Sequence, residues 1–254
     1  MKKKICASCL LGASLLLCSC GSHYELTKVS RTRILIDKRY DSAQDTQANI
    51  FLAPFKQKVD SILCPVVGTA AKYLSAYRPE SPLSNLLSDI LVWSGKLYNE
   101  QPVLGVYNIG GMRAAFAQGE VTYGDVVEVA PFENKICFLT LKGDKLLELF
   151  SQISKRGGEG VSHGVELVIN DEKEMVSVLL NGEEIDPAAS YRVATIDYVA
   201  EGNDGMTAFK SATDINAPSE EKNNIRYIIM EYFREQAAAG NAVNSEIEGR
   251  ITIK

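Results

Sequence analysis

The sequence predicts an α/β (α+β) domain in which helices flank a mixed sheet. Segments with helical periodicity alternate along the chain with short apolar runs of strand length, which is typical of a domain that packs helices on a sheet. The dipeptide Asn181-Gly182 indicates a tight hairpin turn, so some neighbouring strands are antiparallel. No internal repeat or low-complexity run follows residue 40, and we therefore expect one domain.

The predicted helices have apolar residues spaced three and four positions apart, as on a helix with one buried face. The four longest are residues 45–63, 84–98, 143–154 and 225–239. Pro54 should kink the first or start a second segment, because proline removes a helical hydrogen bond. Pro82 and Ser84 suit the start of the second helix. Shorter helical stretches are expected at 113–117 and within 121–129.

The predicted strands are short runs that are apolar throughout or alternate between apolar and polar residues. They are residues 33–36, 64–74, 103–107, 136–141, 165–169, 176–180, 191–196 and 247–253. Residues 165–169 and 176–180 are expected to pair with each other. Helices and hairpins occur in the same stretch of chain, so the predicted sheet contains both parallel and antiparallel neighbours.

The first residues are predicted to be a lipoprotein signal peptide. Three lysines precede an apolar stretch of about 13 residues, which is too short to span a bilayer. The stretch ends in Leu17-Cys18-Ser19-Cys20, which resembles a bacterial lipobox. Cys20 is the expected lipidation site because the small residue Ser19 precedes it. An ordinary secretory signal peptide with incidental cysteines is the alternative.

These features predict three parts of the chain. Residues 1–19 are the lipoprotein signal peptide, residues 20–40 are a tether and the first strand, and residues 41–254 are the folded domain. Attachment of two or more acyl chains anchors a soluble domain stably. We therefore expect an exported bacterial lipoprotein that is anchored to a membrane and faces the periplasm.

Charge and cysteine content narrow the possible partners. The formal net charge is −5, and it becomes about −8 once the three lysines of the leader are removed. An acidic surface argues against nucleic acid as a partner. Cys64 and Cys137 remain besides Cys20, and they either form a disulfide or stay as buried thiols. No cysteine spacing resembles a zinc motif.

The first of three irregular segments with ligand-binding residues is 108–113, which follows a predicted strand. Gly110 and Gly111 let the backbone approach a ligand closely and present N–H groups to an anion. Arg113 adds a guanidinium group that can donate two hydrogen bonds to a phosphate. The alternative is a simple turn.

The other two segments add aromatic rings and a carboxylate. Residues 130–134 place Phe132 and Asn134 after a proline, and residues 197–205 place Tyr198 and Asp204 among glycines. Alternatively, the phenylalanine packs in the core and the last segment is a solvated turn; its spacing does not match a complete calcium loop. Together the segments supply rings to stack on a base, amides for its edge, and donors and acceptors for ribose and phosphate.

The order and spacing of the blocks resemble the C-terminal domain of the 5′-nucleotidase family over roughly residues 65–254. The blocks are Asn108-x-Gly-Gly-Met-Arg113, Gly119-Glu-Val-Thr-Tyr-Gly-Asp125-Val, Pro131-Phe132-x-Asn134, Leu141-Lys-Gly143-x-x-Leu146, Tyr191-Arg-Val-Ala-Thr195, Asp197-Tyr198 and Gly202-Asn203-Asp204-Gly205. The resemblance implies the fold of that domain and a site for the nucleoside part of a nucleotide.

The resemblance also implies a role for each site residue. Phe132 and Tyr198 match two aromatics that sandwich the base, with tyrosine where many members have phenylalanine. Asn108 and Asn134 match amides that contact the edge of the base. Asp204 matches the carboxylate that holds the ribose hydroxyls.

Phosphate recognition is the least complete part of the resemblance. Arg113 matches an arginine that reaches the phosphate, but a further arginine of some members is missing before Ser84-Asn85-Leu86. Met112 replaces a commoner isoleucine, and Asn203 replaces a commoner glycine. The missing arginine lowers the expected affinity for phosphate more than that for nucleoside.

Metal ligands are scarce in this chain. Members of the family hydrolyse phosphate esters with an N-terminal metallophosphoesterase domain, and a two-metal site needs many converging ligands. This sequence contains only His23 and His163, and no Asp-x-His string. We therefore assign no catalytic residue, metal ligand or cofactor to it, expect His163 at the surface, and expect the divalent metals on a partner chain.

The resemblance thus implies the nucleotide- or nucleoside-binding domain of a 5′-nucleotidase-type phosphohydrolase of exported nucleotide catabolism. A separate metallophosphoesterase chain is the expected partner. One alternative is a self-sufficient nucleotide or sugar-nucleotide phosphohydrolase. The other is a lipoprotein that keeps the fold without binding a ligand.

Overall fold

The computed structural model describes residues 24–40 and 45–254. Contacts between residues divide the chain into two compact units, residues 1–51 and 52–254. In the first unit, residues 24–36 form no strand, and a short 3-10 helix, η1 (Lys38–Tyr40), follows. The strand predicted at 33–36 is therefore wrong. A strand needs a hydrogen-bonded neighbour, and Ile34 and Ile36 are 71% and 95% exposed instead. Cys20, His23 and the predicted signal peptide lie outside the described residues.

The first long helix is α2 (Thr46–Leu63), and it confirms the helix predicted at 45–63. It runs through Pro54 as one helix, so the predicted second segment is wrong. None of its residues is buried. Across residues 24–40 and 45–254, no helix has both the length and the apolar character needed to cross a membrane.

The second unit contains three sheets. Their strands are β1 (Val66–Ala70), β2 (Leu104–Tyr107), β3 (Gly119–Thr122), β4 (Ile136–Lys142), β5 (Gly160–Val161), β6 (Val165–Ile169), β7 (Met175–Leu180), β8 (Glu183–Glu184), β9 (Ser190–Ile196), β10 (Thr213–Asn216) and β11 (Ile251–Ile253). The central sheet has the order β10-β4-β9-β2-β5, the second β11-β6-β7-β8, and the third β1-β3. Strands β2 and β9 are parallel and β4 and β9 antiparallel, which confirms the mixed sheet.

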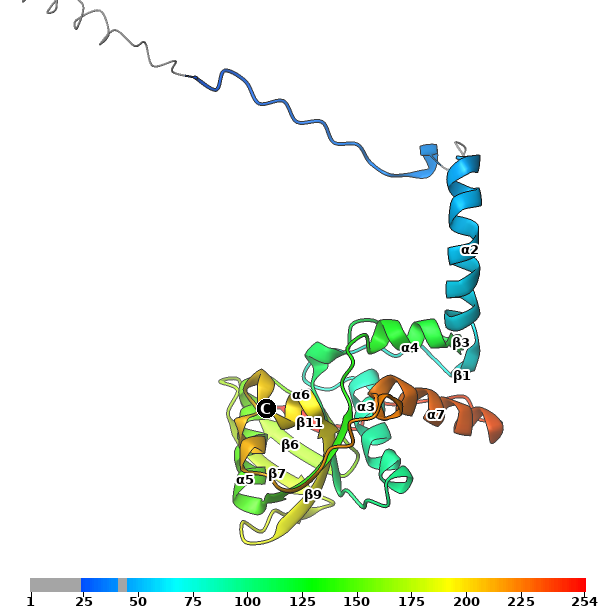
Figure 1. The fold of residues 1–254 in the computed structure, drawn as a ribbon. Coiled ribbons are helices and arrows are strands. Elements are labelled where there is room, and N and C mark those ends of the chain that lie inside the picture. Colours follow the sequence, from blue (N-terminus) through cyan, green and yellow to red (C-terminus); the bar gives the residue numbers. More distant parts are fainter. Residues whose placement is uncertain (1–23, 41–44) are drawn as a thin grey trace, which may run out of the picture. The chain divides into compact units, whose positions relative to one another are not determined.

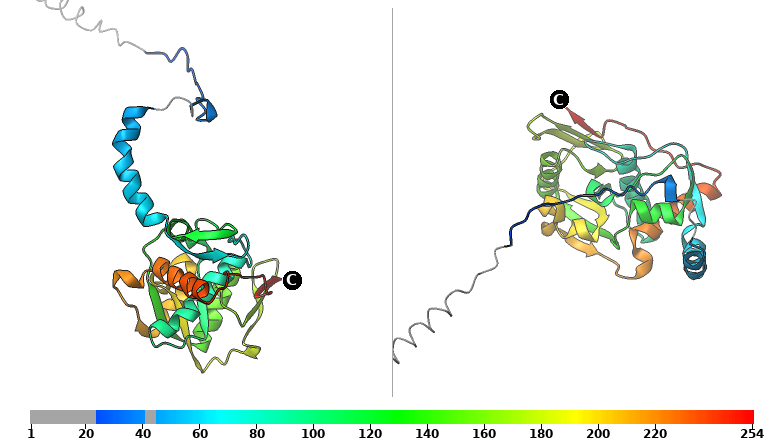
Figure 2. Two further views of the ribbon diagram at one scale, coloured as in Figure 1. Left: turned by 90° about the vertical axis from the view of Figure 1, so that its right-hand side faces the viewer. Right: turned by 90° about the horizontal axis from the view of Figure 1, so that it is seen from above.

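Helices cover both faces of the central sheet (Figures 1 and 2). Helix α3 (Pro82–Ser94) packs against β2, β5 and β9. On the other side, α5 (Gly143–Lys155) packs against β4 and β9 and also contacts β7 of the second sheet. Helix α7 (Ile225–Ala238) packs on α3, on β1 and on the small helix α4 (Tyr123–Val129). The buried apolar side chains of these elements form one continuous core.

Two short elements differ from the prediction between residues 109 and 122. The helix expected at 113–117 is wrong: the turn comes earlier, as η3 (Ile109–Gly111). Phe116 instead exchanges backbone hydrogen bonds of 2.9 and 3.0 Å with Leu74, which holds this stretch extended. The region 121–129 begins with β3, paired with β1, and only its second part is the predicted helix, α4.

Cys64 and Cys137 are free thiols. Cys137 is buried in β4, and burial raises the pKa of its thiol to about 11. Cys64 is exposed just before β1. The disulfide alternative is therefore wrong for this pair, and only Cys137 is a buried thiol.

Candidate functional site

Three loops meet at one edge of the central sheet because of how its strands run. The parallel strands β2 and β9 end at the same edge, and the segments 108–113 and 197–205 follow them. Strand β4 is antiparallel to β9, with Ile136 opposite Ile196, so it begins at that edge. The backbone N–H of Asp197 donates to the carbonyl of Lys135 over 2.9 Å. The segment 130–134 thus lies beside the other two.

The three loops enclose a cavity of about 230 Å³. Its lining consists of Asn108, Gly110, Gly111, Phe132, Asn134, Tyr198 and Asp204. All seven are residues that the sequence predicts for one site. Phe132 is 48% exposed and Tyr198 39%, so the alternative of a phenylalanine packed in the core is wrong. Two accessible rings with amides and a carboxylate between them can hold a flat, polar-edged ligand.

A hydrogen bond across the cavity connects the first and third loops. The side-chain nitrogen Nδ2 of Asn108 donates to Oδ2 of Asp204 over 2.7 Å. A carboxylate can only accept, which fixes the orientation of the Asn108 amide. Asn108 is therefore held by Asp204, and its carbonyl oxygen Oδ1 is a buried acceptor left unpaired among the described residues.

Close packing explains Gly111 of the first loop, and backbone conformation explains the glycines of the third loop. A Cβ at Gly111 would lie 2.8 Å from Oδ1 of Asn108, so any larger residue would push that amide out of place. In the third loop Gly202, Asp204 and Gly205 have φ of 80°, 54° and 75°. Aspartate is one of the few residues other than glycine that adopts this left-handed conformation readily. These left-handed residues turn the chain so that Asp204 lines the cavity.

Glu159 is a site residue that the sequence does not predict. Strand β5 pairs antiparallel with β2, with Gly160 opposite Tyr107, so Glu159 lies at the same sheet edge. Its side chain is fully buried, and Oε2 accepts the backbone N–H of Ile109 over 2.6 Å. Oε1 forms ion pairs with Arg78 and Arg156. The only sequence indication would be β5, which is too short at two residues to show periodicity.

Arg113 is the one predicted contact that does not line the cavity. Its side chain is exposed, and Nη1 donates to the carbonyl of Gly110 over 3.4 Å, a long hydrogen bond. The guanidinium group is therefore held next to the glycine turn, outside the lining.

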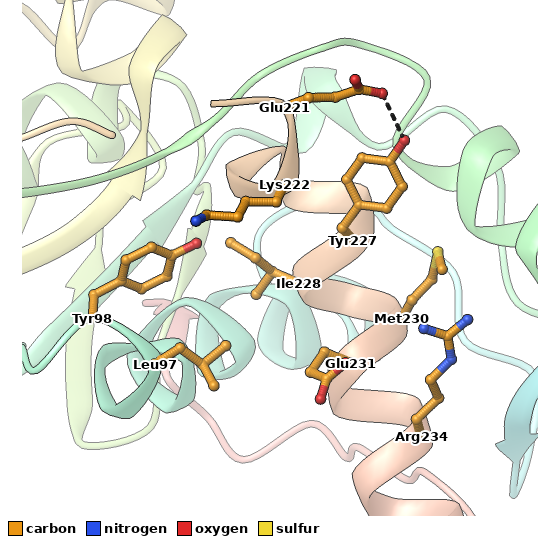
Figure 3. A pocket seen from close by; sticks show the side chains of 9 residues that line it. All are labelled: Leu97, Tyr98, Glu221, Lys222, Tyr227, Ile228, Met230, Glu231 and Arg234. Carbon is orange, nitrogen blue, oxygen red and sulfur yellow. Dashed lines mark hydrogen bonds between the residues drawn. The ribbon is translucent and has the colours of Figure 1, made fainter. Parts of the chain in front are cut away.

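A larger groove of about 500 Å³ lies elsewhere, along α7 and the 3-10 helices η2 (Gly95–Leu97) and η6 (Glu221–Asn223) (Figure 3). In it the hydroxyl of Tyr227 donates to Glu221 over 3.1 Å. Its lining includes Ile228 and Arg234 but no residue of the three loops. The smaller cavity, which gathers the predicted residues, is therefore the candidate site.

His163 lies at the surface, as the sequence predicts. Its side chain is 79% exposed, and Nδ1 is 2.9 Å from Oε2 of Glu248. Within residues 24–40 and 45–254, no group of three or more histidine, cysteine, aspartate and glutamate side chains is placed to hold a metal ion.

Comparison with known proteins identifies the domain. Residues 66–211 match the family described as 5′-nucleotidase, C-terminal domain. The chain belongs to this family. The match begins at β1 and includes every residue of the cavity lining, so in this 5′-nucleotidase C-terminal domain the three loops are part of the family fold.

The relatives are much longer than this domain. The trifunctional nucleotide phosphoesterase YfkN of Bacillus subtilis is 27% identical over 82% of the chain, which covers 15% of that protein. Protein UshA of Yersinia enterocolitica is 28% identical over 64% of the chain and 30% of its own length. The crystal structure of the 5′-nucleotidase precursor of Thermus thermophilus is 26% identical with a TM-score of 0.68, over 83% of this chain and 43% of that one. The chain thus spans less than half of each.

Proposed function

We propose that this domain binds the nucleoside part of a nucleotide in the cavity between its three loops. The observation that carries the proposal is the position of Phe132 and Tyr198, two exposed aromatic rings on the lining of one small cavity. Exposed aromatic side chains lose apolar contact with water when a base stacks on them, and each such stack stabilises binding by about 1–3 kcal/mol. Neither ring is needed to fill the core.

The polar groups of the cavity suit the rest of a nucleoside. Asp204 is an acceptor for the vicinal hydroxyls of ribose, and Asn134 and Asn108 can pair with donors and acceptors on the edge of a base. The cavity of about 230 Å³ is smaller than the pockets of about 300–1,000 Å³ that enclose a complete drug-sized ligand. In our proposal the nucleoside occupies it and the phosphate projects outward, toward the side where Arg113 lies.

The same proposal assigns the chemistry to a second polypeptide. A metallophosphoesterase chain would supply the divalent metals for the hydrolysis, and this domain would hold the substrate in reacting geometry. The two histidines of the sequence and the names of the relatives, which are nucleotidases and nucleotide phosphoesterases, support this division. The pair would act in nucleotide catabolism outside the cytoplasm.

The decisive experiment is calorimetry with adenosine and AMP. We expect the wild-type protein to bind at least one of them, and Phe132→Ala and Tyr198→Ala each to lose about 1–3 kcal/mol of binding free energy, since a stacking face is removed. Tyr73→Ala is the matched control, because Tyr73 is 63% exposed and does not line the cavity. Unchanged affinity in both folded cavity variants would contradict base stacking.

Membrane attachment is a separate part of the proposal and has its own test. We propose that Cys20 is acylated and anchors the protein at the periplasmic face of a membrane. Labelled fatty acid should enter the wild type and Cys18→Ala but not Cys20→Ala, and only Cys20→Ala should leave the membrane fraction. Incorporation of label into Cys20→Ala would refute this assignment.

A further inference from the structure

Beneath the cavity lies a buried carboxylate that the proposed function does not use. Glu159 lies in the loop between α5 and β5, and none of its side chain is exposed. Burying a carboxylate is costly unless it is paired and hydrogen-bonded. A fully buried glutamate therefore needs hydrogen-bonded and charged partners. The identity of these partners shows which segments the carboxylate holds in place.

The partners of Glu159 connect it to the first loop of the cavity. Oε2 accepts the backbone N–H of Ile109 over 2.6 Å. Ile109 begins the turn η3, whose Gly110 and Gly111 line the cavity. Two guanidinium groups, those of Arg78 and Arg156, neutralise the other oxygen. The carboxylate thus holds the backbone of the glycine turn in position at the edge of the central sheet.

The second connection leads to the third loop. Arg156 caps the end of α5, and its Nη2 is 3.6 Å from Oδ1 of Asp204. The other oxygen of Asp204 accepts Nδ2 of Asn108, the residue just before the glycine turn. Glu159 contacts Ile109 directly, and it is connected to Asn108 through Arg156 and Asp204. Because Asn108 and Ile109 are adjacent in the chain, these contacts form a closed ring.

We propose that Glu159 is a positioning residue of the nucleoside cavity and that Arg156 extends its hold to Asp204. The ligand in this inference rests on the proposed function. Loops that are held in place before binding need not be ordered by the ligand, which improves its affinity. A glutamine at 159 has the same shape but no charge. Its single acceptor oxygen cannot accept from two guanidinium groups and the Ile109 N–H together, and its NH₂ group is a donor. The first and third loops of the cavity should therefore become more mobile.

The test measures amide hydrogen exchange and adenosine binding on the same variants of the full chain. Glu159→Gln should exchange faster at residues 108–112 and 203–206 and bind adenosine about tenfold more weakly, as for loss of a charged hydrogen bond. Arg156→Gln should loosen residues 203–206 and leave 108–112 protected. The matched control is Glu100→Gln, which breaks a similar glutamate–arginine pair with Arg192 elsewhere and should not raise exchange at either loop above that at β6 and β7.

The outcomes separate this inference from the proposed function. Unchanged exchange at both loops in Glu159→Gln overturns the inference, and so does an equal increase throughout, including β6 and β7, because that is general destabilisation. Where Glu159→Gln fails to fold, Arg156→Gln decides, and unchanged exchange at 203–206 overturns the inference. If the loops respond as expected but the wild type binds neither adenosine nor AMP, the proposed function fails and the positioning role stands.

Discussion

At the scale of single residues, the hydrogen bond between Asn108 and Asp204 determines what the cavity offers to a ligand. The Asn108 amide donates to the carboxylate over 2.7 Å, and its own oxygen is buried without a partner among the described residues. The same hydrogen bond provides Oδ2 of Asp204 with a donor, and Nη2 of Arg156 lies 3.6 Å from Oδ1. These two contacts hold the carboxylate of Asp204 in one orientation on the lining of the cavity.

Asn108→Asp tests this arrangement through its pH dependence. The variant places two carboxylates where the wild type has a 2.7 Å hydrogen bond, and two such groups cannot both be ionised without repulsion. We expect adenosine affinity to fall about tenfold or more at neutral pH, and to recover in part toward pH 5 as the pair takes up a shared proton that restores a donor. Calorimetry at the two pH values measures this.

The control for that variant is Asn170→Asp, which adds the same charge at the end of β6, away from the cavity. It should bind adenosine like the wild type at both pH values. Equal affinity of Asn108→Asp and the wild type at neutral pH would mean that the hydrogen bond has no part in binding.

The sequence predicts the lining side chains but not the groups that support them. Phe132, Tyr198 and Asp204 are recognisable because an aromatic ring or a carboxylate stands in a segment rich in glycine and proline, where loops form. Glu159 lies in the segment Arg156-Gly-Gly-Glu159-Gly, a glycine-rich pattern that is equally typical of a solvent-exposed turn. Its burial follows from the register of β5 on β2, a long-range pairing that no local pattern indicates.

At the scale of elements, the strand directions of the central sheet create the site. Two parallel strands that end together and two antiparallel neighbours that begin there bring four chain segments to one edge. The long helices and the strands at 136–142 and 190–196 were predictable because several turns or a full apolar run repeat the same pattern. Strands β3, β5 and β10 were not, because they have at most four residues and owe their conformation to a partner strand.

At the edge of the central sheet opposite the cavity, Glu100 connects strands β9 and β10 through an ion pair and a hydrogen bond. Both oxygens of Glu100 accept from Arg192 in β9, at 2.7 and 2.8 Å, and Oε1 also accepts from Asn216 in β10. The hydrogen bond with Arg192, opposed by burial, holds the pKa of the Glu100 carboxyl below its ordinary value of 4.5. A carboxyl group whose pKa is lowered by folding stabilises the folded state above that ordinary value and loses the effect as pH falls through the folded pKa.

Glu100→Gln should therefore destabilise the protein in a pH-dependent way. At neutral pH we expect a loss of about 1–2 kcal/mol of unfolding free energy, since a largely buried charged hydrogen bond is removed. The difference from the wild type should shrink below pH 4.5 as Glu100 of the wild type takes up its proton. Urea unfolding at pH 7 and pH 3 measures it, with exposed Glu183→Gln as the control. A difference of the same size at both pH values would contradict the assignment.

At the scale of the molecule, we propose that the cavity is one part of a larger site. In our proposal it holds the base and the ribose, whereas the guanidinium group of Arg113 is exposed beside it. The chain spans 43% of the Thermus thermophilus 5′-nucleotidase and smaller shares of the curated relatives. A nucleotide bound as we propose would present its phosphate to a surface outside this domain, which is where a metal site on another polypeptide could reach it.

Arg113 gives the most direct test of that two-chain arrangement. An arginine directed at phosphate contributes to catalysis only if a metal site grips the same phosphate from the opposite side, because holding the substrate in reacting geometry lowers the barrier. The metallophosphoesterase chain alone should then hydrolyse AMP slowly, and adding this domain should raise kcat/KM. Arg113→Ala should lose most of that gain and Arg113→Lys should keep part of it, because a point charge replaces a planar group with two donors. Lys173→Ala, which removes an exposed charge on the turn between β6 and β7, should stimulate like the wild type. Steady-state hydrolysis of AMP with and without each variant decides the matter: equal rates with and without the wild-type domain, or full stimulation by Arg113→Ala, would exclude a nucleotidase built from these two chains.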